Sequence, residues 1–173
     1  PIESTLEDIG AAIDEPDLVA RAVLTGRDGQ MLGTVTFTQH GEPVEVEVEL
    51  AGVAGAGMHG IHIHEVGDCS AADFSSAGGH WAPRGNPHGC PPDENRHAGD
   101  LGNVEVGEDG NGAMELTVDN VTVVDGELSV VNRAVILHSG EDDCTSQPAG
   151  ASGERIACGV IQLLGREGLL EDC

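Results

Sequence analysis

Hydrophobic and polar positions alternate along much of this chain with the two-residue period of a β-strand. The clearest case is 44–50, which reads Val-Glu-Val-Glu-Val-Glu-Leu and places its apolar side chains on one face and its glutamates on the other. Similar short apolar runs occupy residues 19–24, 32–38, 58–64, 103–106, 113–118, 121–124, 130–138 and 156–164. About eight short strands with almost no helical pattern predict an all-β fold, either an antiparallel barrel or a sandwich.

Two long segments between these runs lack any such periodicity. Residues 65–100 are rich in Gly, Pro, Ser, Asp and Asn, and residues 139–154 have the same character. A loop of roughly 35 residues is uncommon inside a compact domain unless it is functional or held in place by other interactions. We therefore expect both loops to have a function.

The length of 173 residues predicts one domain. We expect a flexible acidic leader at 1–17, for which a short helix at 9–18 is the alternative, then the domain at 18–164 and a C-terminal tail at 165–173. Pro1 is interpreted as the start of a processed or trimmed chain, and no apolar segment is long enough to cross a bilayer. Aromatic residues make up only 2%, so the core must be built from Val, Leu, Ile and Ala.

The net charge is −24, from 31 acidic and 7 basic residues, and all the basic residues are Arg. Nucleic acid and anionic membranes are therefore poor partners. So much acid indicates either a well-solvated surface or, as we favour, a protein adapted to high salt, where a screening length of about 3 Å at 1 M removes the self-repulsion.

Five cysteines are present, at 69, 90, 144, 158 and 173, and no C-x-x-C pair occurs. A thiolate zinc site is therefore not indicated. One or two disulfides in an oxidising compartment fit better than free thiols, and Cys173 is expected to be the free cysteine.

Histidines concentrate where the first long loop begins, because residues 59–97 contain six of the eight. His62 and His64 share one face of a predicted strand. Further along, three imidazoles and one carboxylate make a good tetrahedral zinc set: His80, His88, His97 and Asp100. His138 ends another apolar run and could complete a second site, which suits copper or zinc, if one imidazole is shared. We expect structural roles for His40 and His59.

Four motifs resemble copper–zinc superoxide dismutase and appear in the family's order. They are GIHIHE at 60–65, SAGGH at 76–80, RHAGDLGN at 96–103 and RIACGVI at 155–161. The resemblance covers about 18–164 and implies an eight-stranded antiparallel Greek-key barrel, an immunoglobulin-like sandwich with two long functional loops. It implies the dismutation of superoxide to oxygen and hydrogen peroxide.

The resemblance also implies the site residues. It assigns copper, one per subunit, to His62, His64, His80 and His138, and zinc, one per subunit, to His80, His88, His97 and Asp100. His80 would bridge the two metals and move protons. Arg155 would hold the superoxide anion, Asp142 would link His62 to His88, and Cys69 would pair with Cys158.

This chain departs from the family around the second loop. The loop contains no Lys, and Glu154 adjoins Arg155, so electrostatic steering of superoxide should be weak or salt-dependent. Cys90 and Cys144 each lie two residues after a member of the expected His88–Asp142 pair. We therefore favour a second disulfide between them over two free thiols.

An active periplasmic or extracellular enzyme is the leading interpretation, lipid-anchored or freely secreted. A non-catalytic protein of this fold that binds or buffers metal is the alternative from another class. A zinc hydrolase is disfavoured, because its zinc would need an open coordination position and the expected ligand set is closed. The sequence does not distinguish a monomer from a homodimer.

Overall fold

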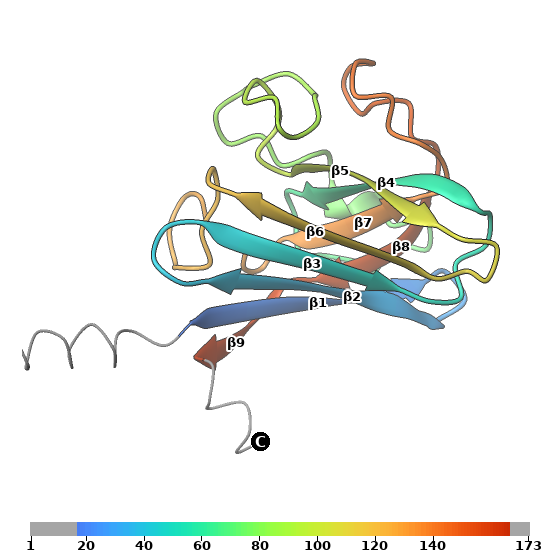
Figure 1. Cartoon of the computed structure of the whole chain (residues 1–173), viewed down its shortest axis with the longest axis horizontal. Coiled ribbons are helices and arrows are strands. Elements are labelled where there is room, and N and C mark those ends of the chain that lie inside the picture. The colour runs from blue at the N-terminus through green and yellow to red at the C-terminus, as the bar shows by residue number, and fades with distance from the viewer. Residues whose placement is uncertain (1–16, 167–173) are drawn as a thin grey trace, which may run out of the picture.

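The computed structural model describes residues 17–166, and its regular structure consists of strands and one short 3₁₀ turn, η1 (Ser75–Ala77) (Figure 1). The strands are β1 (Leu18–Gly26), β2 (Met31–Gln39), β3 (Val44–Leu50), β4 (Gly57–His64), β5 (Asp100–Val106), β6 (Gly112–Val118), β7 (Ala134–His138), β8 (Arg155–Val160) and β9 (Gln162–Arg166). The predicted leader, its alternative helix and most of the predicted tail lie outside the described residues.

The strands form one antiparallel sheet in the order β2-β3-β6-β5-β4-β7-β8-β1-β9, and pairing of β1 with β2 closes it into a barrel. β8 and β9 act as one interrupted strand, because β8 pairs with β7 and with the end of β1, whereas β9 pairs with the beginning of β1. The neighbours β3–β6, β4–β7 and β1–β8 are far apart in sequence, as in a Greek key. The predicted all-β fold with eight strand positions is confirmed.

The alternating pattern that predicted β3 is the pattern of burial in the structure. Val44, Val46, Val48 and Leu50 are buried, and the three glutamates between them are exposed. The barrel interior is almost entirely aliphatic, with Phe37 as its largest fully buried side chain. Removing this apolar surface from water is the main stabilising contribution to the barrel.

The prediction of a strand at 121–124 is wrong. Val121 and Val123 are buried alternately, as in a strand, but the segment belongs to a loop. The carboxamide oxygen of Gln39, at the end of β2, accepts hydrogen bonds from the Val123 N–H (2.6 Å) and the Thr122 hydroxyl (2.9 Å). The Thr122 backbone also pairs with the far end of the same loop, where its N–H donates to the Leu128 carbonyl and its carbonyl accepts from the Val130 N–H, but this is an isolated bridge and not a strand.

The predicted strand at 130–138 is shorter than expected, because β7 begins only at Ala134. Asn132 adopts a left-handed conformation with φ 70°, which interrupts an extended chain. The predicted strand at 156–164 is divided at Ile161 into β8 and β9. The Ile161 N–H donates to the Arg133 carbonyl, just before β7, and the residues that follow Ile161 pair with β1 instead.

Both long loops extend from the same side of the barrel, next to β4, β5 and β7 (Figure 1). They bring residues 65–99 and 139–154 close to the ends of the strands that contain histidines. Within residues 17–166, no helix has the length and apolar character that crossing a membrane would require.

Candidate metal centre

Strand pairing and the first loop bring four histidines together, which we call the four-histidine group: His62, His64, His80 and His138. His62 and His64 are on β4, which pairs antiparallel with β7, the strand that ends at His138. His80 is placed by the first loop, which continues the pairing along β4. The Trp81 N–H donates to the Ile63 carbonyl (2.9 Å), and His80 and His64 form an isolated bridge.

Hydrogen bonds on the outer side of the group fix the orientation of three of these rings. His62 Nε2 lies 2.6 Å from Asp142 Oδ2, His64 Nδ1 lies 2.8 Å from the Gly78 carbonyl, and His138 Nδ1 lies 3.3 Å from the Gly153 carbonyl. These acceptors require N–H on the outer nitrogens. The opposite nitrogens, which face the centre of the group, therefore keep free lone pairs.

Burial keeps these rings neutral. It lowers the pKa of His64 to about 2 and that of His138 to about 4, and it lowers the pKa of His62 well below its ordinary value. The positive charge of Arg155 adds to the effect of burial on His64 and His138. Their lone pairs are therefore not protonated at neutral pH.

His80 also belongs to a second set, which we call the His–Asp group: His80, His88, His97 and Asp100. His80 Nδ1 lies 2.9 Å from Asp100 Oδ1 and 3.2 Å from His97 Nδ1, and His88 Nδ1 lies 3.0 Å from Asp100 Oδ2. The two nitrogens of the His80 ring thus face different groups.

Asp100 is held in place by backbone donors. Its Oδ2 accepts from the N–H groups of Gly89 (3.0 Å) and His97 (2.9 Å). Burial alone would raise the pKa of this carboxyl, but the hydrogen bonds from His80 and Gly89 lower it overall. Asp100 is therefore an anion at neutral pH, the form in which a carboxylate can bind a metal.

The donor atoms of both groups suit metal ions. The inward-facing nitrogens of the four-histidine group have no hydrogen-bond partner, and the His–Asp group gathers three imidazoles around the Asp100 carboxylate. Within the described residues, six buried side-chain polar atoms lack a hydrogen bond, and five of them are histidine nitrogens of these groups. They are Nδ1 of His62 and His88 and Nε2 of His64, His80 and His138. Buried polar groups are normally satisfied, so five unsatisfied lone pairs in one place indicate ligands for cations.

Asp142, in the second loop, connects the two groups. Its Oδ2 accepts from His62 Nε2 (2.6 Å) and its Oδ1 from His88 Nε2 (2.7 Å), and all three side chains are buried. Asn103 on β5 fixes the aspartate backbone by accepting from its N–H (2.8 Å) and donating to its carbonyl (3.0 Å). One carboxylate thus orients one ring in each group.

Arg155, at the start of β8, lies beside the four-histidine group. Its guanidinium donates to the carbonyls of Phe74 (2.8 Å) and Gly78 (2.7 Å), and the Gly78 carbonyl is also the acceptor for His64. The Cys69–Cys158 disulfide ties the same part of the first loop to β8. The charge of Arg155 is therefore held in a fixed place next to one histidine of the group.

The structure also contains a disulfide between Cys90 and Cys144, the pair that we favoured from the sequence.

His59 belongs to neither group, since its ring nitrogens face the carbonyls of His138 (2.8 Å) and Gly55 (2.6 Å). The exposed His40 ring lies with its Nδ1 2.6 Å from Asp17 Oδ1.

Two residues that support the site had no sequence signal. The Arg27 Nε donates to the Arg155 carbonyl (2.8 Å), and Gln147 exchanges two hydrogen bonds with the backbone of His88. Both act on backbone atoms, which every residue type offers, so no residue pattern could have indicated them.

Comparison with known proteins identifies relatives over most of the chain. Residues 31–161 match the sequence model of the copper/zinc superoxide dismutase family. A SOD-like protein from Bacillus subtilis is 31% identical, with 81% of this chain and 96% of that chain covered and a TM-score of 0.73. A double mutant of that protein, in which a tyrosine and a proline are each replaced by histidine, is 32% identical, with 82% and 96% covered and a TM-score of 0.74.

Proposed function

Because this chain belongs to the copper/zinc superoxide dismutase family, we propose that it is an active dismutase that converts two superoxide anions and two protons to oxygen and hydrogen peroxide. The observation that supports activity most directly is the position of Arg155 beside four histidines with free lone pairs. A fixed cation next to a copper site is suited to bind a small anion.

The donor atoms suggest which residues hold each metal. We assign copper to the four-histidine group and zinc to the His–Asp group, and His80 would belong to both sets. Imidazole suits copper, and three histidines with one carboxylate suit zinc. When bound, copper supplies one-electron oxidation and reduction, and zinc polarises the shared imidazole.

The remaining chemistry belongs to the protein. Arg155 holds the anion by charge and by its planar N–H groups, while the carbonyls of Phe74 and Gly78 keep the guanidinium in place. His80 Nε2, which has no hydrogen-bond partner in the protein, would take up a proton and donate it to the reduced oxygen product, while the rest of the His–Asp group holds the other side of the ring. Asp142 keeps His62 and His88 in their orientations.

A non-catalytic metal-binding protein is the second candidate. Metal storage would use the same histidines, but it would give Arg155 no role in anion binding.

The two disulfides suit an oxidising compartment, so we assign the protein to the periplasm or the cell exterior.

The test of the proposed function is whether the protein loaded with copper and zinc inhibits the reduction of cytochrome c by superoxide. We expect inhibition at catalytic concentrations, with an equal amount of protein loaded with zinc alone as the inactive control. Stoichiometric binding of both metals without inhibition would instead support the metal-binding protein.

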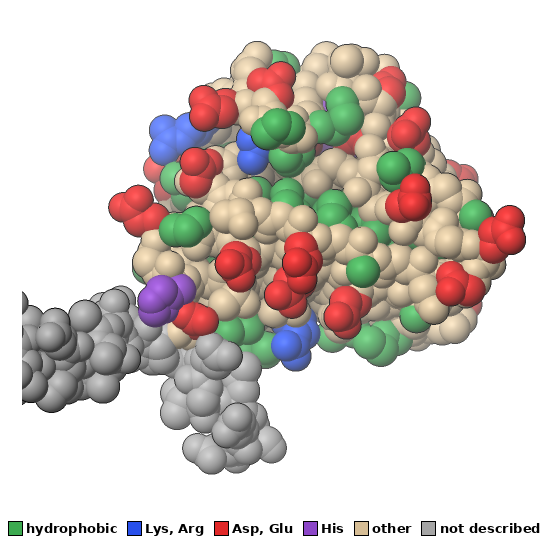
Figure 2. Space-filling model, in the orientation of Figure 1, with side chains coloured by type: hydrophobic (Ala, Val, Ile, Leu, Met, Phe, Trp, Pro, Cys, Tyr) green, Lys and Arg blue, Asp and Glu red, His purple; other side chains and the backbone are tan. Residues whose placement is uncertain are grey.

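We also propose that the acidic surface is an adaptation to high salt. Figure 2 shows carboxylates spread over the face of the molecule that it presents. Some lie in unfavourable positions, since Glu47 on β3 and Glu115 on β6 are both exposed and directly opposite in the sheet. Like charges facing each other across strands destabilise a sheet at low salt.

The unfolding temperature should therefore rise between low and molar salt, and Glu47→Gln should raise it by about 1–3 °C at low salt and by less at molar salt. Glu105→Gln is the matched control, because Glu105 faces Met58 and not another acid. Thermal unfolding followed by circular dichroism would measure both effects. An unfolding temperature that does not increase with salt would rule out the adaptation.

A further inference from the structure

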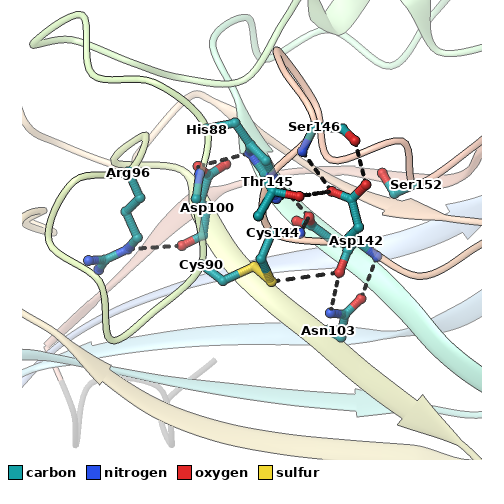
Figure 3. The surroundings of a disulfide bond; sticks show 12 residues. His88, Cys90, Arg96, Asp100, Asn103, Asp142, Cys144, Thr145, Ser146 and Ser152 are labelled. Atoms are coloured by element: carbon teal, nitrogen blue, oxygen red, sulfur yellow. Dashed lines mark hydrogen bonds and ion pairs between the residues drawn. A yellow bond between two sulfur atoms is a disulfide. The ribbon is translucent and has the colours of Figure 1, made fainter.

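The Cys90–Cys144 disulfide joins the two long loops where they contribute residues to the metal centre (Figure 3). Cys90 follows His88 by two residues in the first loop, and Cys144 follows Asp142 by two residues in the second. The Cα atoms of the two cysteines are 5.1 Å apart. The proposed reaction uses neither sulfur, so the bond needs another explanation.

The disulfide is directly connected to the Asp142 carboxylate. The Cys144 N–H donates to Asp142 Oδ1 (2.8 Å), the same oxygen that accepts from His88 Nε2 (2.7 Å). Cys144 has φ 67°, in the left-handed region that residues other than glycine rarely adopt. Its contacts, rather than its own backbone preference, therefore keep the loop in this conformation.

The second loop lies against His88 at two further points. Gln147 Nε2 donates to the His88 carbonyl (2.9 Å), and the His88 N–H donates to Gln147 Oε1 (2.7 Å). At Gly150, an added Cβ would collide with Asp142 Oδ1 and His88 Nε2. A small outward movement of this loop would therefore separate the carboxylate from the histidine.

We propose that the Cys90–Cys144 disulfide positions Asp142. It holds the second loop on the first, so that the carboxylate stays between His62 and His88 before any metal binds, and it thereby slows the loss of zinc. The inference about zinc rests on the proposed function, which makes His88 a zinc ligand. Without the bond, two segments 54 residues apart would stay together through non-covalent contacts alone.

The test compares a parent protein with a variant that lacks only this disulfide. The parent carries Cys173→Ser, which removes the fifth cysteine and prevents exchange of disulfides. The variant adds Cys90→Ser and Cys144→Ser. Under denaturing conditions, the unmodified protein should contain one free thiol and the parent none.

Two measurements then report on the loop. Zinc release from protein loaded with zinc alone can be followed with a chelating dye. We expect it to be roughly tenfold faster in the variant, because losing the group that orients a metal ligand typically lowers metal affinity by about tenfold or more. In the metal-free proteins, amide hydrogen exchange in residues 139–154 should also be faster in the variant, while exchange in β3 stays the same. Thr145→Ala, next to Cys144 in the exposed part of the same loop, is the matched control and should behave like the parent.

The outcomes separate this inference from the proposed function. Zinc release within twofold of the parent, together with unchanged exchange, would overturn the role of the disulfide and leave the dismutase intact. A parent that retains no zinc would contradict the proposed ligands, while exchange in the metal-free proteins would still decide whether the bond fixes the loop. If the serine pair does not fold, the pair Cys90→Ala and Cys144→Ala replaces it. Unfolding of both pairs would overturn the inference, because the bond would then be required by the barrel itself.

Discussion

Replacing His80 by alanine is expected to reduce dismutase activity at least about 100-fold, the lower end of what a positioned proton donor contributes. The same change should lower the content of both metals, because the two nitrogens of this ring face the two groups. Activity per milligram and metal content by mass spectrometry are the measurements.

The fold should survive this substitution. The substitution removes the hydrogen bond between His80 Nδ1 and Asp100 Oδ1, but Asp100 would keep the N–H groups of Gly89 and His97 and the contact with His97 Nδ1. The metal-free variant should therefore unfold close to the temperature of the metal-free parent. His40→Ala is the control, since that ring is exposed and paired with Asp17. Full activity with both metals retained in His80→Ala would refute the shared ring.

Reversing the charge of Arg155 is the second large effect that we expect. Arg155→Glu should lower the rate about 100-fold, a loss comparable to that of one well-placed donor for an anion. Copper and zinc content should change far less, because the guanidinium contacts the carbonyls of Phe74 and Gly78 and none of the free histidine nitrogens. Arg155→Lys should lie between the two, since it keeps the charge but loses the planar pair of donors.

The control for total charge is Arg21→Glu, which makes the same two-unit change on the exposed side of β1. It should reduce the rate only slightly, and molar salt should remove most of that reduction by screening. Rates from pulse radiolysis across a salt series would compare the variants. If both charge reversals lowered the rate equally, the field of the whole protein, and not the position of Arg155, would control anion capture.

Local patterns predicted the strands well wherever one face of the sheet meets the core and the other meets water. Residues 44–50 are the best example, because each valine and each glutamate there records which face it occupies. The loop at 121–124 shows the same alternation for a different reason. Its partners are the side chain of Gln39, more than 80 residues away, and the backbone of residues 128–130, which form a single bridge with Thr122 and no strand.

Histidine spacing alone predicted the candidate site as a set of residues, and its arrangement was predictable only through the resemblance to the family, which placed Asp142 between His62 and His88. Spacing could not have predicted the contact between His88 and Asp142, because it depends on two loops that meet only in the folded chain. The residues that keep this arrangement in place act mainly through backbone atoms. Such contacts depend on the course of the main chain and leave no trace in composition or spacing.

The Gly78 carbonyl, which accepts from both His64 and Arg155, limits how the site could be re-engineered. A library of variants in the 3₁₀ turn at Ser75–Ala77 would shift that oxygen and disturb metal affinity and anion preference together. Arg27 offers a more selective point of change, because it reaches Arg155 only through the backbone of that residue. Selection for a different small anion should therefore begin at the hairpin between β1 and β2.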